Sequence, residues 1–189
     1  MPLDLKIGDV LCLERKDSMF SPVANTISFF QKIGNIFTKQ EKNLPIKASE
    51  IIHVGIMISN DYYAEVNAIG VQIKPLSDFK KGWACLLSDE LREKFKFLTL
   101  KNSYLNFIEE RLYDRFDYQH FFALAPYLLT GRKLFKPKKD TRLNVCSEFV
   151  AAALEQLGIE NKFNNPSRMT PSDIFNEDWY KARLYIDKK

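Results

Sequence analysis

The amino-acid sequence predicts an α+β fold in a single domain that spans residues 1–189. The predicted strands are grouped between predicted helices, and this order is typical of that fold class. A chain of 189 residues with 46% hydrophobic content is long enough to bury one substantial core, whereas two domains would each be small. No internal repeat, low-complexity tract or linker divides the chain.

Short apolar runs that lie between turn residues predict the strands. Residues 49–58 are rich in β-branched side chains, and turns at residues 60–61 and 68–70 connect this run to two further runs. We therefore expect a three-stranded antiparallel meander. The predicted strands are residues 8–14, 49–58, 62–67, 71–74, 83–87 and 182–186.

Apolar residues at spacings of three and four predict the helices. A Ser-Pro pair begins the first of them, and Ser88 is a suitable start for a long second one. The predicted helices are residues 21–37, 88–112 and 117–129, one that includes Cys146 in its first turn, and a short capped turn at 170–175.

Cys146 lies in the first turn of a strongly predicted helix. Asn144 is a suitable N-cap, alanines and leucines follow, and Gly158 is a suitable stop. The first N–H groups of a helix have no internal partner, and the helix dipole adds positive charge there, so a thiolate is favoured. Cys146 is therefore a candidate nucleophile, although a cysteine at a buried helix start is commonly only a small core residue.

A cysteine nucleophile needs an imidazole that moves its proton and a third polar group that orients the imidazole. Of the two histidines, His53 lies on a predicted strand, whereas His120 lies in a stretch that resembles a packed helix. Glu65 follows on the next strand, diagonal to His53 in the simplest register around the turn. His53 remains open as a strand histidine satisfied by its neighbours, and Glu65 as a solvated side chain.

The cysteines and histidines argue against other chemistries. Cys12, Cys85 and Cys146 are far apart and odd in number, which favours reduced thiols over a disulfide framework, and Cys12 and Cys85 are predicted to be core residues. Two distant histidines without a His-Glu-x-x-His helix give no ligand set for a metal. We therefore expect neither a metal nor a cofactor.

The net charge of +4 comes largely from a basic segment that begins at Arg132 and ends at Lys139. This segment is either a solvated loop or a peripheral contact for phosphate or lipid headgroups. Aromatic residues are not interleaved across a broad basic face, so nucleic-acid binding is not predicted. The sequence shows neither a signal peptide nor a membrane span, which fits a cytoplasmic location and leaves the compartment open.

Six short motifs occur in an order that resembles a known family. They are Lys-Ile-Gly-Asp-Val-Leu at 6–11, His-Val-Gly-Ile at 53–56, Ala-Glu-Val at 64–66 with Gly70-Val71, Tyr113-Asp114, Val-Cys-Ser-Glu-Phe-Val at 145–150, and Thr-Pro-Ser-Asp at 170–173. Together they resemble the circularly permuted papain-like hydrolases of the NlpC superfamily, typified by the YiiX-like enzymes. The resemblance spans nearly the whole chain, and the histidine and cysteine motifs are its most specific parts.

The resemblance implies a permuted papain-like (NlpC-type) fold, in which a small antiparallel sheet or half-barrel packs against helices. It implies that Cys146 is the nucleophile, His53 the general base and then acid, and Glu65 the orienting group. Tyr113 matches a family tyrosine and is a candidate for binding the oxyanion or the substrate. Tyr118 is close enough to compete for that role, and a packed aromatic is the alternative.

The implied reaction is acyl transfer through a thioester on Cys146. The family includes amidases and peptidases, and the related lecithin:retinol acyltransferase group includes lipid acyl transferases, so the expected substrate is a small molecule, a peptide or an acyl lipid. The apolar stretches 21–37 and 104–135 favour an acyl-lipid or lipidated amide over a bare cell-wall peptide. The alternative is a catalytically silent module of the same fold that binds lipid or a partner. Because the sequence keeps all three triad candidates, the enzyme is the favoured hypothesis.

Overall fold

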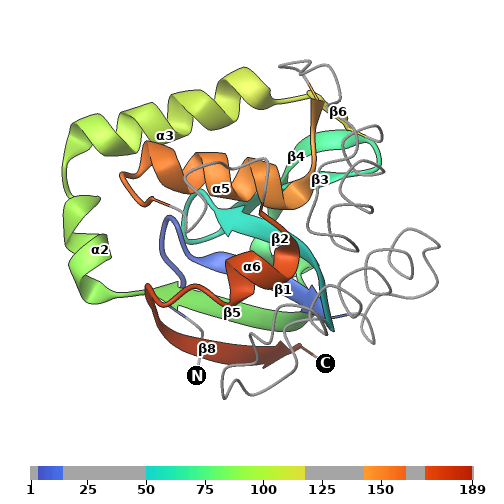
Figure 1. Cartoon of the computed structure of the whole chain (residues 1–189), viewed down its shortest axis with the longest axis horizontal. Coiled ribbons are helices and arrows are strands. Elements are labelled where there is room, and N and C mark those ends of the chain that lie inside the picture. Colours follow the sequence, from blue (N-terminus) through green and yellow to red (C-terminus); the bar gives the residue numbers. More distant parts are fainter. Residues whose placement is uncertain (1–3, 15–49, 118–142, 161–168, 189) are drawn as a thin grey trace, which may run out of the picture.

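The computed structural model describes residues 4–14, 50–117, 143–160 and 169–188. Within them a six-stranded antiparallel sheet has the order β4-β3-β2-β1-β5-β8, and helices cover one of its faces (Figure 1). The predicted α+β class is therefore confirmed. The assignment of residues 1–189 to one domain stays a prediction.

The predicted strands are present, with small differences at their ends. The sheet strand β5 begins two residues earlier than expected, and β8 extends beyond the predicted strand at both ends. The meander of β2, β3 and β4 is confirmed, with Asn67 paired to Gly70 across its second turn. The strands are β1 (Val10–Glu14), β2 (Ile51–Met57), β3 (Tyr62–Asn67), β4 (Gly70–Pro75), β5 (Lys81–Leu87) and β8 (Tyr180–Asp187), with a parallel pair β6 (Arg115–Phe116) and β7 (Leu143–Asn144) outside the main sheet.

The long helix predicted over residues 88–112 is wrong, because the chain forms two helices there. Helix α2 (Asp89–Lys94) ends in a tight turn, and Phe97 adopts an extended conformation before α3 (Leu98–Arg111) begins. The apolar stripe of the sequence is continuous across this break. The break changes the direction of the chain, which allows Tyr104 and Ile108 of α3 to pack in the core over α5 (Cys146–Gln156).

The other predicted helices divide into those that the structure describes and those that it does not. The short helix α6 (Pro171–Phe175) has the expected start, where Thr170 and Asp173 form a reciprocal capping box. Of the predicted helix 117–129 only residue 117 is described, and it lies outside any helix. The predicted helix 21–37 and the basic segment 132–139 lie outside the described residues. No helix in the described part of the chain is long and apolar enough to cross a membrane.

The larger core lies between the sheet and the helices. Helices α5 and α6 contact β2, and α3 packs on the other side of α5, so the helices form layers on this face (Figure 1). The hydroxyl of Tyr104 donates to the carbonyl of Met57, 2.8 Å away, and ties α3 to the sheet. Cys12 and Cys85 lie fully buried in this core with their sulfur atoms 3.7 Å apart, so their predicted burial is confirmed.

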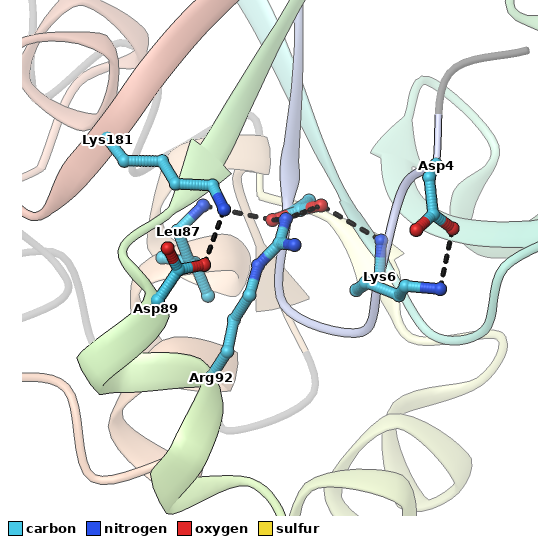
Figure 2. Close-up of polar contacts among 7 residues, drawn as sticks. Asp4, Lys6, Leu87, Asp89, Arg92 and Lys181 are labelled. Atoms are coloured by element: carbon cyan, nitrogen blue, oxygen red, sulfur yellow. Dashed lines mark hydrogen bonds and ion pairs between the residues drawn. The ribbon is translucent and has the colours of Figure 1, made fainter.

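The Gly-Asp pair of the first motif has a structural role. The carboxylate of Asp9 is fully buried, accepts hydrogen bonds from the backbone N–H groups of Lys6 and Leu87, both at 2.9 Å, and pairs with Arg92 at 2.7 Å. Figure 2 shows Arg92, Lys6 and Leu87, whose guanidinium and backbone N–H groups are the donors to this carboxylate. Gly8 has a φ of 86°, which favours glycine at this turn. This network joins the start of β1 to β5 and α2.

Candidate active site

Cys146 is the first residue of α5, and it is 6% exposed. The predicted N-cap is wrong: Val145 is the cap residue, and it provides no side-chain hydrogen bond to the helix. Asn144 lies one residue too early because it belongs to β7, where it pairs with Phe116. The side chain of Val145 makes no bond to the first turn of α5, where the positive end of the helix dipole favours a negatively charged substrate oxygen.

Two contacts fix the start of α5 in place. The hydroxyl of Ser147 donates to the carbonyl of Met169 at 2.7 Å, and the ring of Phe149 stacks on Phe107 of α3 with centroids 5.9 Å apart. Both Ser147 and Phe149 are buried. The cysteine is therefore held on a rigid element rather than on a loop, as a positioned nucleophile requires.

His53 and Glu65 meet across β2 and β3, a contact that the predicted diagonal placement allowed but did not require. In the observed register Glu65 is opposite Gly55, so it is diagonal to His53, and the two side chains reach each other on the same face of the sheet. The distance from His53 Nε2 to Glu65 Oε2 is 3.0 Å. The side chain of His53 is 25% exposed and that of Glu65 10% exposed.

A β-bulge accompanies His53, and the sequence did not predict it. Leu13 of β1 pairs with His53, but Glu14 pairs with Ile51, so Ile52 is an extra residue on β2. The pairing of β2 with β3 runs from Met57 to Gly55 and stops short of His53. His53 therefore lies where β2 departs from regular pairing, a position that can redirect a side chain toward a site. No glycine or proline at Ile51, Ile52 or His53 signals the bulge.

The imidazole of His53 interacts with Cys146 as well as with Glu65. Burial alone would lower the pKa of His53, but the charge of Cys146 and a hydrogen bond with it, followed by the hydrogen bond and charge of Glu65, raise it to about 10. Because Nε2 faces Glu65, Nδ1 is the ring nitrogen left for the thiol. The raised pKa of His53 and the lowered pKa of Glu65 favour an imidazolium that is paired with a carboxylate.

A polar network on β3 and β4 surrounds the second oxygen of Glu65. Lys74 Nζ lies 2.6 Å from Glu65 Oε1, and the amide of Asn67 donates to Glu65 Oε1 at 3.4 Å and to Gln72 Oε1 at 2.8 Å. Burial raises the pKa of Glu65, but the hydrogen bond and charge of His53, and then those of Lys74, lower it to about 2. Glu65 is therefore ionised throughout the neutral range.

Sequence reasoning missed Lys74, Asn67 and Gln72. The signal that points to them is the two-residue period of a strand, because residues 63, 65 and 67 pair with 74, 72 and 70 and so share their face of the sheet. A lysine on this face next to a buried carboxylate is a candidate ion-pair partner.

Tyr113 is not joined to the other predicted residues. Its side chain is 87% exposed, its φ is 70°, and its backbone N–H donates to the carbonyl of Val71 at 3.3 Å. Within the described ranges no hydrogen bond links its phenol to Cys146, His53 or Glu65, so a role in oxyanion or substrate binding stays a prediction. The competing residue, Tyr118, and the second histidine, His120, lie outside the described residues.

The described residues assemble the parts that acyl transfer through a thiol requires. They are a cysteine at a helix start, an imidazole whose pKa this cysteine raises, and a carboxylate that holds the imidazole. Among these residues no group of three or more histidine, cysteine, aspartate or glutamate side chains is placed to hold a metal ion. Neither a protein-family model nor a curated protein matches the chain, so these comparisons place it in no family.

Proposed function

We propose that the protein is a thiol-dependent acyl-transfer enzyme with a permuted papain-like fold. Cys146 attacks the carbonyl carbon of an amide or ester and forms a thioester, which water or another acceptor then releases. The reaction class is hydrolysis of amides, peptides or acyl lipids, or transfer of their acyl group. The observation that carries the proposal is the pairing of His53 with Glu65 at 3.0 Å, together with the influence of Cys146, which is the largest cause that raises the pKa of His53.

Each proton and bond in this reaction has a residue to handle it. The sulfur of Cys146 forms a bond to the carbonyl carbon, the bond to the leaving nitrogen or oxygen breaks, and His53 donates its proton to that atom. In the second half His53 takes a proton from water, the water oxygen attacks the thioester, and the sulfur leaves as the thiolate. Glu65 holds the imidazole and stabilises its charged form.

The start of α5 is suited to the charge that develops on the carbonyl oxygen. Its first N–H groups carry the positive end of the helix dipole, and Val145 caps the helix without a competing side-chain bond. One such donor lost in an oxyanion hole costs about 100-fold to 1,000-fold in rate. A backbone donor has no side chain to remove, so the thiol and the imidazole are the groups to test.

The test is alkylation by iodoacetamide at pH 5.5, followed by peptide mapping of all three cysteines. An ordinary thiol has about one thiolate in a thousand molecules at this pH, so a Cys146 paired with His53 should react at least about 100-fold faster than such a thiol. Cys12 and Cys85, which are fully buried, are internal controls that should remain unmodified. In His53→Gln the labelling of Cys146 should fall by about the same factor, whereas His120→Gln, at the other histidine, should leave it unchanged.

The catalytically silent binding module predicts a different result. In that case Cys146 reacts slowly, its rate rises only with the ordinary ionisation of a thiol, and His53→Gln does not change it. That outcome would refute the proposal that the protein is a thiol-dependent enzyme. The apolar stretches 21–37 and 104–135 favour an acyl-lipid substrate, which is part of the proposal. Residues 21–37 and 118–135 of these stretches lie outside the described residues.

A further inference from the structure

Glu65 lies on the middle strand of the meander and has a partner on each neighbouring strand. In the sheet β3 lies between β2, which carries His53, and β4, which carries Lys74. Glu65 pairs with Gly55 on one side and with Gln72 on the other. His53 and Lys74 are each two residues away from these positions, so both are diagonal to Glu65. Long side chains reach each other across such a diagonal, and the three residues form one oblique row across three strands.

The two oxygens of the Glu65 carboxylate have different partners. Oε2 lies 3.0 Å from His53 Nε2, whereas Oε1 lies 2.6 Å from Lys74 Nζ. The last torsion of a glutamate side chain is soft, so a bond to one oxygen alone does not fix the plane of the carboxylate. Because Lys74 holds Oε1, the carboxylate is fixed at both ends, and Oε2 is the oxygen that faces the imidazole.

Asn67 contacts the same oxygen at a longer distance. Its amide nitrogen donates to Glu65 Oε1 at 3.4 Å and to Gln72 Oε1 at 2.8 Å, and its Oδ1 accepts the backbone N–H of Ile69 at 2.9 Å. The amide of Asn67 therefore mainly connects β3 to β4. An ammonium at 2.6 Å holds a carboxylate more firmly than a neutral amide at 3.4 Å, because it is closer and carries the opposite charge. Of the described partners of Oε1, Lys74 is the closest.

The pair of Lys74 and Glu65 lies at the border between the protein and the solvent. The side chain of Glu65 is 10% exposed and that of Lys74 34% exposed. Ion pairs open to solvent contribute little to stability, so the free energy of unfolding does not explain this pair. Tyr63, which is opposite Lys74 in the register, adds no charge, because burial and then the charges of Glu65 and Asp78 raise the pKa of its phenol. Lys74 is thus suited to determine where the carboxylate lies.

We propose that Lys74 is a positioning residue of the active site, which holds the carboxylate of Glu65 so that Oε2 keeps His53 in the orientation that acyl transfer requires. Its ammonium transfers no proton and acts on the imidazole only through Glu65. The catalytic part of the inference rests on the proposed function, because it needs the thioester on Cys146. A displacement of about 1 Å in a catalytic group can cost about 100-fold in rate. Since the carboxylate keeps its other bonds, we expect the loss of Lys74 to cost about threefold to tenfold.

The first measurement tests the contact itself and needs no substrate. An imidazole N–H that donates to a carboxylate gives a proton NMR signal far downfield of the backbone amides when its exchange with water is slow. We expect this signal from Nε2–H of His53 in the wild type in mildly acidic solution, and its absence in His53→Gln assigns it. In Lys74→Met the signal should broaden or disappear, whereas in Lys74→Arg, which keeps a charged donor, it should remain. Lys101→Met, at an exposed lysine of α3, should leave it unchanged.

The second measurement is the hydrolysis of p-nitrophenyl hexanoate, from which kcat and KM are determined separately. In Lys74→Met we expect kcat to fall about threefold to tenfold while KM is unchanged, because Lys74 does not touch the substrate. Lys74→Arg should recover most of this loss. In a Glu65→Gln background Lys74→Met should not slow the reaction further, since Lys74 acts only through the carboxylate. A loss of packing alone would not be recovered by arginine or depend on Glu65.

Three results would overturn the inference. The first is a wild type without the downfield signal, and the second is a Lys74→Met variant with the signal and the kcat of the wild type. The third is an equal loss of kcat in the presence and in the absence of Glu65, which would show that Lys74 acts independently of the carboxylate. If the wild type transfers no acyl group, the proposed function fails instead. The NMR measurement then still decides whether Lys74 positions Glu65 and His53.

Discussion

The pKa of His53 is the quantity that the candidate site perturbs most directly. Its rise from 6.5 to about 10 corresponds to about 5 kcal/mol, because each pH unit is worth about 1.4 kcal/mol. Burial opposes this rise, and among the groups that produce it Cys146 contributes more than Glu65. Removing either partner should therefore lower the pKa of His53, and removing Cys146 should lower it further.

Two substitutions separate these contributions. In Cys146→Ala the imidazole loses its largest favourable partner while it keeps the unfavourable burial, and we expect its pKa to fall by about 2 to 3. In Glu65→Gln we expect the pKa of His53 to fall by about 1 to 2. Part of this fall comes from the positive charge of Lys74, which is no longer paired with the carboxylate of Glu65. The double variant Glu65→Gln with Lys74→Met should recover that part.

The assay is an NMR titration of the imidazole signals between pH 4 and 11. The chain has only two histidines, so His120→Gln assigns the signals of His53. A wild-type pKa close to 6.5 would refute the proposed contacts at once. A raised pKa that changes in neither Cys146→Ala nor Glu65→Gln would show that other groups cause the rise.

Three further predictions concern stability, each measured as the free energy of unfolding in urea. Arg92→Met should cost about 3 to 5 kcal/mol, because it leaves the buried carboxylate of Asp9 without its charged partner. Lys96→Met, which breaks an exposed pair with Glu93, should cost less than about 1 kcal/mol. Equal losses in the two variants would contradict the role of Asp9. The stability that wild type gains over Glu65→Gln should be greatest between about pH 4.5 and 6.5. Because the pKa of Glu65 is lowered, its contribution to the free energy of unfolding is lost as the pH falls toward 2. Because the pKa of His53 is raised, its contribution is lost as the pH rises toward 10. A stability difference that does not depend on pH would contradict the ion pair. Thr170→Val should cost about 1 kcal/mol through the lost capping box. Ser172→Ala should cost clearly less, because the Ser172 hydroxyl has no hydrogen-bond partner among the described residues.

The sequence predicted the strands well because each is short, apolar and bounded by turn residues. The turn after Met57 also determined that Glu65 lies diagonal to His53, a consequence of antiparallel pairing alone. The break between α2 and α3 was not predictable from the helical period, since the apolar stripe continues through it and only packing on α5 favours two helices.

The finer details of the site depend on contacts between distant segments. Asn144 looked like a cap because local preference favours it, but its pairing with Phe116 in β7 leaves Val145 at that position. The bulge at Ile52 arises from the pairing of β1 with β2, for which no local signal exists. Lys74 became visible as the second partner of Glu65 only with the register of β3 and β4.

Intact-mass analysis of the acyl-enzyme tests the central claim most directly. The protein is quenched within seconds of mixing with p-nitrophenyl esters from acetate to decanoate, and the adduct is treated with neutral hydroxylamine. We predict one added acyl group on Cys146 that hydroxylamine removes, as expected for a thioester, and none in Cys146→Ala. In Cys146→Ser any adduct should be an ester that resists the same treatment. An adduct that persists in Cys146→Ala, or the absence of an adduct on Cys146 with every ester, would contradict the claim that Cys146 is the nucleophile.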